Sequence, residues 1–305
     1  MSQGVRKGLL YLSYGTPRCE EDLIPYLTSI RGRIPTEAEV DSLRQRYDLI
    51  GSFQGGLSPL NDVTSRQGRA LVDFLNAKDT SSDWVLYEGY KHLDPSIEDA
   101  VFSMAEAGIR EAVAIVAAPF YSSMGTADYG RRAQAKAAEL GVKLTIVDAW
   151  WQHASFLACW QEALKALPEA QGSRYYILAA HSIPAVAREM RDPYVTDIEA
   201  FGDALATSMG LSDYQVAWQS APPRGQWLTP KVDRVIEEAL AQGFQEIVLV
   251  PIGFITEHLE VLYDDDVVYR EKIEKAGATY YRPMMPNDRE QLVGAMASAV
   301  DGVKE

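Results

Sequence analysis

Short apolar runs alternate with longer amphipathic stretches along the whole chain. The apolar runs have the length and composition of buried parallel strands, and the stretches between them repeat apolar positions with helical spacing. We predict strands at residues 8–14, 85–90, 112–119, 143–148, 175–180, 214–219, 246–251 and 277–281. Helices are expected near residues 20–30, 36–49, 62–77, 96–107, 128–139 and 287–300, and between the later strands. Such alternation is typical of parallel sheets with helices on both faces.

Eight or nine such strands could close into one barrel or divide into two sheets. The helical region over residues 16–80 is too long for a single barrel crossover, and the chain length suits two units of about 150 residues. We therefore predict an α/β fold with two Rossmann-like domains. Ligands of such sheets bind beyond the carboxyl ends of the strands, so residues at these ends are expected to share one cleft between the domains. They are Tyr14, His92, Tyr121, His181, Trp218 and Glu257.

The segment after the strand at residues 246–251 is rich in carboxylates. If it begins an α-helix, Glu257, Glu260 and Asp264 lie on one face, because they are three and four residues apart. Like charges stacked in this way repel unless a cation or a proton is shared, so the face is a candidate track for a divalent metal. The alternative is a solvated acidic first turn, which the helix dipole favours.

His181 follows the predicted strand at residues 175–180. A histidine at the end of a strand suits a metal ligand or a proton acceptor near neutral pH, and the alternative is a packed, hydrogen-bonded ring. His92 is a second candidate of the same kind, whereas His153 and His258 are interpreted as structural. Ser182 does not indicate a hydrolase, because no G-x-S-x-G motif surrounds it.

Arginines and aromatic residues supply the other candidate binding groups. Arginine forks suit carboxylates, although each of these arginines could also be solvated helix surface. A flat apolar ligand with acidic arms would use both sets. The arginines are Arg31, Arg33 and Arg46, and the aromatic residues are Tyr14, Tyr121, Tyr129 and Trp218.

Composition narrows the class of protein. The formal net charge of −14, with no basic stripe, argues against a nucleic-acid partner. The two cysteines, Cys19 and Cys159, are far apart, which argues against disulfides and an iron–sulfur cluster. No apolar run approaches the roughly 20 residues of a membrane span, and no signal peptide precedes the first strand, so we expect a cytoplasmic protein. The glycine-rich residues 51–60 match no P-loop, and no G-x-G-x-x-G follows the first strand.

Several motifs together resemble the ferrochelatase family, and within it the compact form that acts on coproporphyrin III. The most specific are the pair A-H-S-I-P at residues 180–184 and E-H-L-E-V-L-Y-D at residues 257–264, about 80 residues apart. The others are Y-G-T-P at 14–17, I-R-G-R at 30–33, Q-R-Y at 45–47, G-G-L-S-P-L at 55–60, K-H at 91–92 and W-Q-S at 218–220. The resemblance covers nearly the whole chain.

The resemblance implies insertion of Fe²⁺ into a porphyrin on the haem pathway, with His181 and Glu260 as the central pair. It implies that Asp264 lies further along the metal path and that Tyr14 approaches the metal from the opposite face. Residues expected on the propionate side or the outer metal site are Arg31, Arg46 and Ser58. The resemblance also implies that the acidic helix is locally widened into a π-helix.

We expect the first domain to contain residues 1–117 with 282–305, and the second to contain residues 118–281. We expect no tightly bound cofactor and no iron–sulfur cluster, since Fe²⁺ and the porphyrin are substrates. Partners are expected to include neighbouring haem-pathway enzymes in transient contact, and neither nucleic acid nor a transmembrane segment is expected.

Two features depart from the family pattern. Residues Ser52-Phe53-Gln54 are extra residues in the glycine-rich loop, and Val268 stands near the place where relatives carry another carboxylate beyond Asp264. Two alternative functions remain. One is a cobalt or nickel chelatase for an early corrinoid precursor, and the other is a non-catalytic porphyrin or haem carrier, which would not need the pair of His181 and Glu260.

Overall fold

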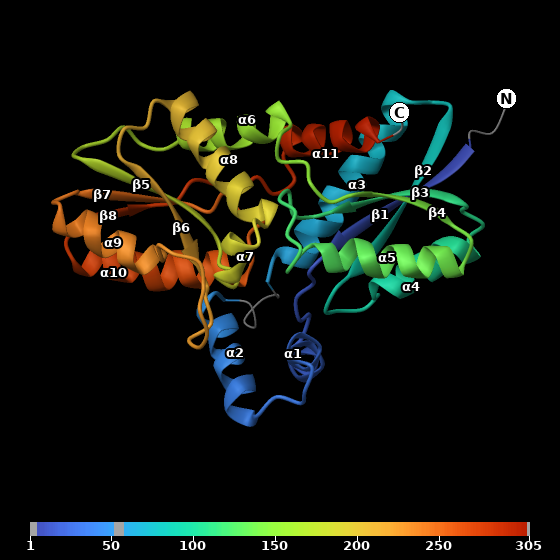
Figure 1. Cartoon of the computed structure of the whole chain (residues 1–305), viewed down its shortest axis with the longest axis horizontal. Helices are drawn as coiled ribbons and strands as arrows, with labels where there is room; N and C mark the ends of the chain where they lie inside the picture. The colour runs from blue at the N-terminus through green and yellow to red at the C-terminus, as the bar shows by residue number, and fades with distance from the viewer. Residues whose placement is uncertain (1–4, 52–57, 304–305) are drawn as a thin grey trace.

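Two four-stranded parallel sheets form the two halves of the molecule (Figure 1). The computed structural model describes residues 5–51 and 58–303, so the extra loop residues 52–54 lie outside the described part. The first sheet contains β1 (Val5–Ser13), β2 (Ser82–Tyr90), β3 (Glu111–Val116) and β4 (Lys143–Val147). The second contains β5 (Arg174–His181), β6 (Tyr214–Gln219), β7 (Glu246–Val250) and β8 (Thr279–Tyr281). All the predicted strands are present, and the fold class is confirmed.

Most of the helices cover the two sheets, and α1 (Leu23–Arg31) and α2 (Glu37–Leu49) project from the body of the molecule (Figure 1). The first half also carries η1 (Glu20–Asp22), α3 (Leu60–Lys78), α4 (Ile97–Glu106) and α5 (Ala127–Glu139). The remaining helices are α6 (Ala154–Lys165), α7 (Val186–Glu189), α8 (Pro193–Met209), α9 (Val232–Ala241), η2 (Glu260–Tyr269), α10 (Arg270–Lys275) and α11 (Glu290–Gly302). Figure 1 shows α1 and α2 below the body, between the two halves. No helix in the described ranges has both the length and the apolar character needed to cross a membrane.

The two sheets have the same strand order, and this order positions the site. The strand orders are β2-β1-β3-β4 and β6-β5-β7-β8. In each half, the second strand lies on one side of the first strand, and the third and fourth strands lie on its other side. Ligands of such sheets bind at the carboxyl ends of the central strands, where the crossovers diverge. Tyr14 directly follows β1, and His181 is the last residue of β5. One candidate residue therefore comes from each of the two switch points.

The expected domain boundary after residue 117 is wrong. Strand β4 pairs in parallel with β3, for example through Ala114 and Ile146, so the first sheet extends to Val147. The second sheet begins only with β5, and α6 lies in the connection between them. Helix α11 packs against α3, α6 and β3, so the end of the chain returns to the first half.

One cluster of buried apolar residues runs through both halves. It contains Leu9 and Tyr11 of β1 together with Leu178 of β5 and Val248 of β7, and helices α6, α8 and α11 also contribute to it. Interiors packed in this way resist relative displacement of their parts. The two sheets are therefore joined by a shared core.

Gln67 of α3 is a buried polar link inside this junction. Its Oε1 accepts a hydrogen bond from the Tyr11 hydroxyl at 2.9 Å, and its Nε2 donates to the Thr256 hydroxyl at 3.1 Å and to the Asn287 carbonyl at 2.6 Å. Gln67 has no exposed surface. One side chain thus ties β1 to two loops of the other half, including the loop that leads to η2.

We predict that Gln67→Leu lowers the free energy of unfolding by about 1–3 kcal/mol, because it leaves buried polar partners without a hydrogen bond. Urea unfolding would measure the loss. The control is Gln291→Leu, which removes exposed hydrogen bonds to Glu162 and should change stability by less than about 0.5 kcal/mol. Equal effects of the two substitutions would contradict the assignment of Gln67 as a buried link.

Candidate active site

The acidic segment forms a π-helix, η2, that begins at Glu260. The widening implied by the family resemblance is therefore confirmed. The expectation of one α-helical face that includes Glu257 is wrong, because Glu257 precedes the helix and its carboxylate lies 3.4 Å from the Arg282 guanidinium. Glu260 and Asp264 remain on η2, with i→i+5 hydrogen bonding in place of the α-helical ladder.

Three consecutive aspartates of η2 have separate polar partners. The Ser220 hydroxyl donates to Asp264 Oδ2 at 2.6 Å, and the Gln219 amide donates to Asp265 Oδ1 at 3.0 Å. Asp265 has no exposed surface, and this burial raises the pKa of its carboxyl well above the usual range. Asp266 pairs with the same arginine that approaches Glu257, at 2.6 Å. The helix can therefore carry three adjacent acidic residues without stacking their charges.

The His181 imidazole and the Glu260 carboxylate meet at the carboxyl end of the second sheet. Their Nδ1 and Oε2 atoms are 3.1 Å apart, and the side chains are 38% and 35% exposed. Gly253, in the loop after β7, makes the close approach that this requires. A Cβ there would lie 2.7 Å from the Cβ of Ala180, the residue before His181. The small residues let the loop that leads to η2 pass directly behind the histidine.

Each member of the pair favours the charged form of the other. Burial raises the pKa of Glu260, but the attraction to His181 outweighs it and sets the pKa to about 2. Burial lowers the pKa of His181, but the charge of Glu260 and their hydrogen bond outweigh it and raise the pKa. Because Nδ1 faces the carboxylate, Nε2 is the ring nitrogen that is available to a proton or a metal.

His258 lies closer to this pair than the sequence indicated. Its Nε2 is 3.9 Å from Glu260 Oε2, while its Nδ1 lies 3.0 Å from the Thr256 carbonyl oxygen. Burial lowers the pKa of His258, so the neutral ring is favoured. The α-helical angle between His258 and its neighbours does not apply, because His258 lies before the helix.

Tyr14 approaches the same region from the first half. The side chain is 40% exposed, and its ring lies against those of His92 at 4.6 Å and Tyr26 at 6.3 Å between centroids. Burial raises the pKa of the Tyr14 hydroxyl, and the charge of Glu260 raises it further. The charge of Glu260 in the second half therefore acts on the phenol of the first half.

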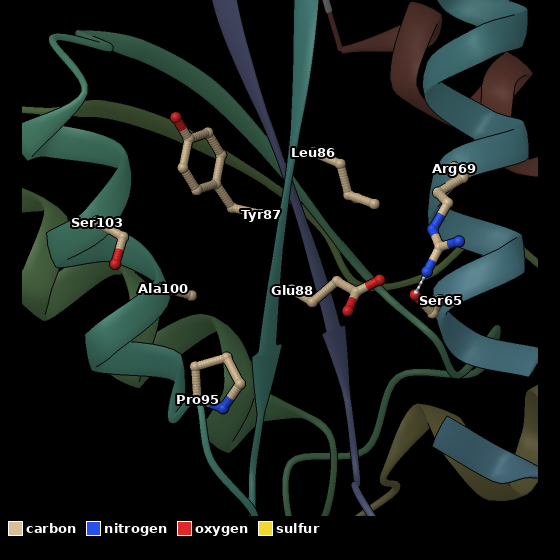
Figure 2. Close-up of a pocket in the computed structure, with 8 residues that line it drawn as sticks. All are labelled: Ser65, Arg69, Leu86, Tyr87, Glu88, Pro95, Ala100 and Ser103. Atoms are coloured by element: carbon tan, nitrogen blue, oxygen red, sulfur yellow. Dashed lines mark hydrogen bonds between the residues drawn. The ribbon is translucent and has the colours of Figure 1, made fainter. Parts of the chain in front are cut away.

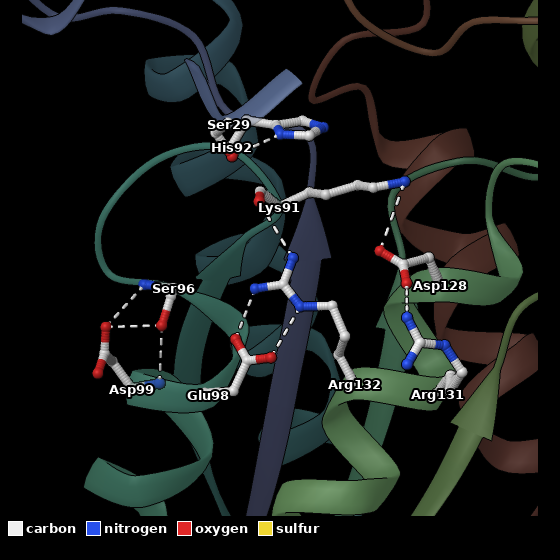
Figure 3. Close-up of polar contacts among 9 residues, drawn as sticks. All are labelled: Ser29, Lys91, His92, Ser96, Glu98, Asp99, Asp128, Arg131 and Arg132. Atoms are coloured by element: carbon white, nitrogen blue, oxygen red, sulfur yellow. Dashed lines mark hydrogen bonds and ion pairs between the residues drawn. The ribbon is translucent and has the colours of Figure 1, made fainter. Parts of the chain in front are cut away.

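His92 supports Tyr14 rather than offering a second proton acceptor. Its Nδ1 is 2.9 Å from the Ser29 hydroxyl, and burial, helped by the charges of Lys91 and Arg132, lowers its pKa to about 4 (Figure 3). The ring is thus uncharged at neutral pH and weakly basic.

An ion-pair network holds the backbone beneath His92 (Figure 3). Arg132 binds the Glu98 carboxylate at 2.8 Å and donates to the Lys91 carbonyl at 3.1 Å. The Lys91 ammonium lies 3.7 Å from Asp128 and 5.1 Å from the centre of the Tyr129 ring. Tyr129 is buried, so it supports the lysine and offers little open surface.

Two of the three candidate arginines share one carboxylate. Arg31 and Arg33 bind Glu39 at 2.5 and 2.7 Å, and the hydrogen bond from Arg33 lowers the pKa of Glu39 to about 2. The guanidinium of Arg31 is partly exposed, so one side of it stays open to solvent.

Arg46 is the candidate arginine that contacts the π-helix. Its guanidinium lies over the Tyr263 ring, 5.2 Å from the centre. Burial raises the pKa of Asp264, and the charge of Arg46 is among the groups that lower it. A cation of α2 in the first half therefore faces the acidic helix of the second half. Ser58 is buried two residues before α3, and its hydroxyl accepts from the Leu60 backbone N–H at 3.5 Å.

The structure does not support Trp218 as an open aromatic surface. Its side chain is only 1% exposed and packs against the Tyr194 ring, with 5.8 Å between centroids. Trp218 of β6 is part of the buried core, where its ring contacts α8 through Tyr194. Tyr121 lies in the loop after β3 and is partly exposed.

The described residues contain a separate pocket that is not part of this site. It has a volume of about 390 Å³ and lies along β2 between α3 and α4 (Figure 2). None of the predicted site residues lines it. Within residues 5–51 and 58–303, no three histidine, cysteine, aspartate or glutamate side chains are grouped so as to hold a metal ion.

Solved structures with this fold are chelatases. The protein titled SirB from Bacillus subtilis with Fe3+ superposes with a TM-score of 0.61 at 10% identity, over 97% of this chain and 95% of that one. CbiX, titled the terminal enzyme for biosynthesis of siroheme in denitrifying bacteria, has a TM-score of 0.50 at 14% identity, over 97% and 98% of the two chains. At these identities the likeness establishes the fold alone.

Sequence comparison gives the family. The ferrochelatase family model matches residues 6–303. The chain is 39% identical over 302 residues to the coproporphyrin III ferrochelatase of Anoxybacillus flavithermus, covering 96% of this chain and 95% of that protein. It is 38% identical over 304 residues to the protein of the same name from Bacillus subtilis, covering 97% of each. The chain belongs to the ferrochelatase family, as its motifs indicated, and is a metal chelatase that acts in haem biosynthesis.

We predict that Glu260→Gln lowers turnover about 10- to 100-fold, because the imidazole loses the partner that orients it. The same change removes the charge that raises the pKa of His181, so that pKa falls. If the neutral imidazole is the active form, the acidic limb of the kcat/KM profile moves to lower pH. Initial rates of metal insertion across pH would measure both effects, and an unmoved limb would contradict the coupling.

Proposed function

We propose that this chain inserts Fe²⁺ into coproporphyrin III, with loss of the two pyrrole N–H protons. The observation that carries the proposal is the contact between His181 and Glu260 on one half, together with the action of the Glu260 charge on the Tyr14 phenol of the other half. A flat macrocycle bound between the halves would have a basic nitrogen on one face and an oxygen donor on the other. The names of the relatives at 38–39% identity support the same substrate.

The chemistry divides between the two members of the pair. His181 Nε2 accepts a pyrrole proton or holds the incoming iron, and Glu260, through Nδ1, fixes the ring and stabilises the imidazolium that forms. The two released protons balance the two charges of the entering cation. Glu260 contacts His181, and Asp264 follows on the same helix, which makes the two carboxylates candidates for the metal path.

Arg46 is the substrate-binding group that the structure supports most directly. It is a cation on α2, close to the site in a protein of net charge −14, and a substrate with carboxylate arms needs such a group. Arg31 and Ser58 stay in the proposed set on the family resemblance, and so does Tyr121 in the loop after β3. Arg31 would have to share its guanidinium between Glu39 and a propionate.

We propose further that the enzyme needs no tightly bound cofactor, works in the cytoplasm and meets neighbouring haem-pathway enzymes only transiently. The alternative from another functional class is a non-catalytic carrier of porphyrin or haem. It would not require the contact between His181 and Glu260, so this contact favours the enzyme. The cobalt or nickel chelatase of an early corrinoid precursor is not favoured by the family match.

The direct test is an anaerobic assay of the purified chain with Fe²⁺ and either coproporphyrin III or protoporphyrin IX, without added cofactor. We expect turnover of coproporphyrin III with a preference of about tenfold or more, because two further carboxylates each add a charge-assisted hydrogen bond. His181→Ala should abolish turnover in a protein that still folds. Equal use of protoporphyrin IX would refute the substrate, and porphyrin binding without turnover would identify a carrier.

Tyr14 is proposed as the iron ligand in the oxidised product complex. A phenolate is a hard anionic donor that binds Fe³⁺, and the cation would offset the repulsion from Glu260 that now raises the pKa of Tyr14. Tyr14→Phe should leave iron insertion mostly intact and change the visible absorption spectrum of bound iron coproporphyrin. Tyr26→Phe, which alters a neighbouring ring in contact with Tyr14, is the control. An unchanged spectrum in Tyr14→Phe would remove Tyr14 from the ligands.

A further inference from the structure

Asp192 is a buried carboxylate that contacts both halves of the molecule. It is only 3% exposed and stands at the N-cap of α8. Its Oδ2 accepts from the Ser123 backbone N–H at 2.9 Å, the Ser123 hydroxyl at 2.6 Å and the Ser122 hydroxyl at 3.4 Å. Its Oδ1 accepts from the Tyr194 backbone N–H at 3.0 Å. Both oxygens are occupied, and all four donors are neutral.

The two sets of donors come from different sheets. Ser122 and Ser123 lie in the loop between β3 and α5 of the first half, directly after Tyr121. Tyr194 lies in the first turn of α8, over the second sheet. A carboxylate without its hydrogen bonds would be costly in this position, so it holds the loop and the helix at a fixed separation.

The next contact leads to the active site. The Tyr194 hydroxyl donates a hydrogen bond of 3.0 Å to the backbone carbonyl of His181. The Tyr194 ring is buried against Trp218, which limits its freedom to move. Burial raises the pKa of Tyr194, and the charge of Glu260 raises it further, in agreement with a position beside the catalytic pair. Asp192, Tyr194 and His181 thus form a continuous series of contacts.

We propose that Asp192 is a positioning residue for metal insertion, which sets the His181 backbone through Tyr194 against the loop that carries Tyr121. The inference rests on the proposed role of His181. It also gives Trp218 a function, since the ring predicted to touch substrate instead supports the tyrosine that holds the histidine.

The chemistry of the donors makes Asp192→Asn an informative change. The amide has the shape of the carboxylate, but its NH₂ group donates. The Tyr194 and Ser123 backbone N–H groups are donors in fixed directions, so one of them must face another donor. If the amide oxygen keeps the serines, the NH₂ group opposes the Tyr194 N–H and displaces the start of α8. Tyr194→Phe tests the last contact alone, because it removes the hydroxyl and leaves the carboxylate undisturbed.

A matched control lies on the same helix. Asp203 also belongs to α8 and also accepts a hydrogen bond from a tyrosine, Tyr214, at 2.9 Å. That contact is exposed. Asp203→Asn makes the same chemical change in an exposed contact further along the helix, so it separates positioning from a general effect on α8.

The experiment compares the full-length wild type with Asp192→Asn, Tyr194→Phe and Asp203→Asn. It measures kcat, the KM values for coproporphyrin III and Fe²⁺, the melting temperature, and the NMR signals of the His181 imidazole without substrate. We expect kcat to fall about 10- to 100-fold in Asp192→Asn and Tyr194→Phe, with smaller changes in the porphyrin KM, because misplacement of a reacting group affects mainly the chemical step. The His181 signals should shift in both variants, and Asp203→Asn should match the wild type.

Wild-type kcat and unshifted His181 signals in folded Asp192→Asn or Tyr194→Phe would overturn the proposal and leave Asp192 as a helix cap. If Asp192→Asn does not fold, Tyr194→Phe decides the question. If the wild type itself does not insert iron, the proposed function fails. The His181 signals then still report whether the series of contacts positions the ring.

Discussion

The contact between the His181 imidazole and the Glu260 carboxylate is the interaction on which the rest of the structure depends. The two residues are 79 positions apart, and parallel pairing of β5 with β7 brings their chain segments together. The loop that follows β7 can reach the histidine only because Gly253 passes close behind Ala180. The resulting pair holds an ionised carboxylate against a ring whose other nitrogen is available for chemistry.

The contacts of the π-helix reduce the repulsion between the acidic residues that follow Glu260. A run of three aspartates follows Glu260 in a protein that is already strongly acidic. Each aspartate has its own partner, and the partners come from the end of β6 and from the residue after β8. Repulsion along the helix is therefore replaced by contacts that attach η2 to the second sheet. Glu260, at the start of η2, is held by the same attachment.

Much of this architecture could be predicted from the sequence, because the strands are continuous apolar runs and the helices are amphipathic. His181 could be selected because it ends such a strand. The face with Glu257 could not be predicted correctly, since periodicity arguments assume an α-helix and η2 is not one. The boundary after residue 117 was wrong because the pairing of β4 with β3 is a non-local contact. The contacts of Asp192 could not be predicted either, since the loop that it binds lies 69 residues away in the sequence.

The most direct test of this account is the tautomer of His181, measured by ¹⁵N NMR in the substrate-free protein at a pH where the ring is neutral. The signal can be assigned by its loss in His181→Gln. The account predicts a proton on Nδ1, donated to Glu260, and a free lone pair on Nε2. A neutral ring protonated on Nε2 would contradict it, because the nitrogen required for chemistry would then be blocked and Glu260 would not be the acceptor.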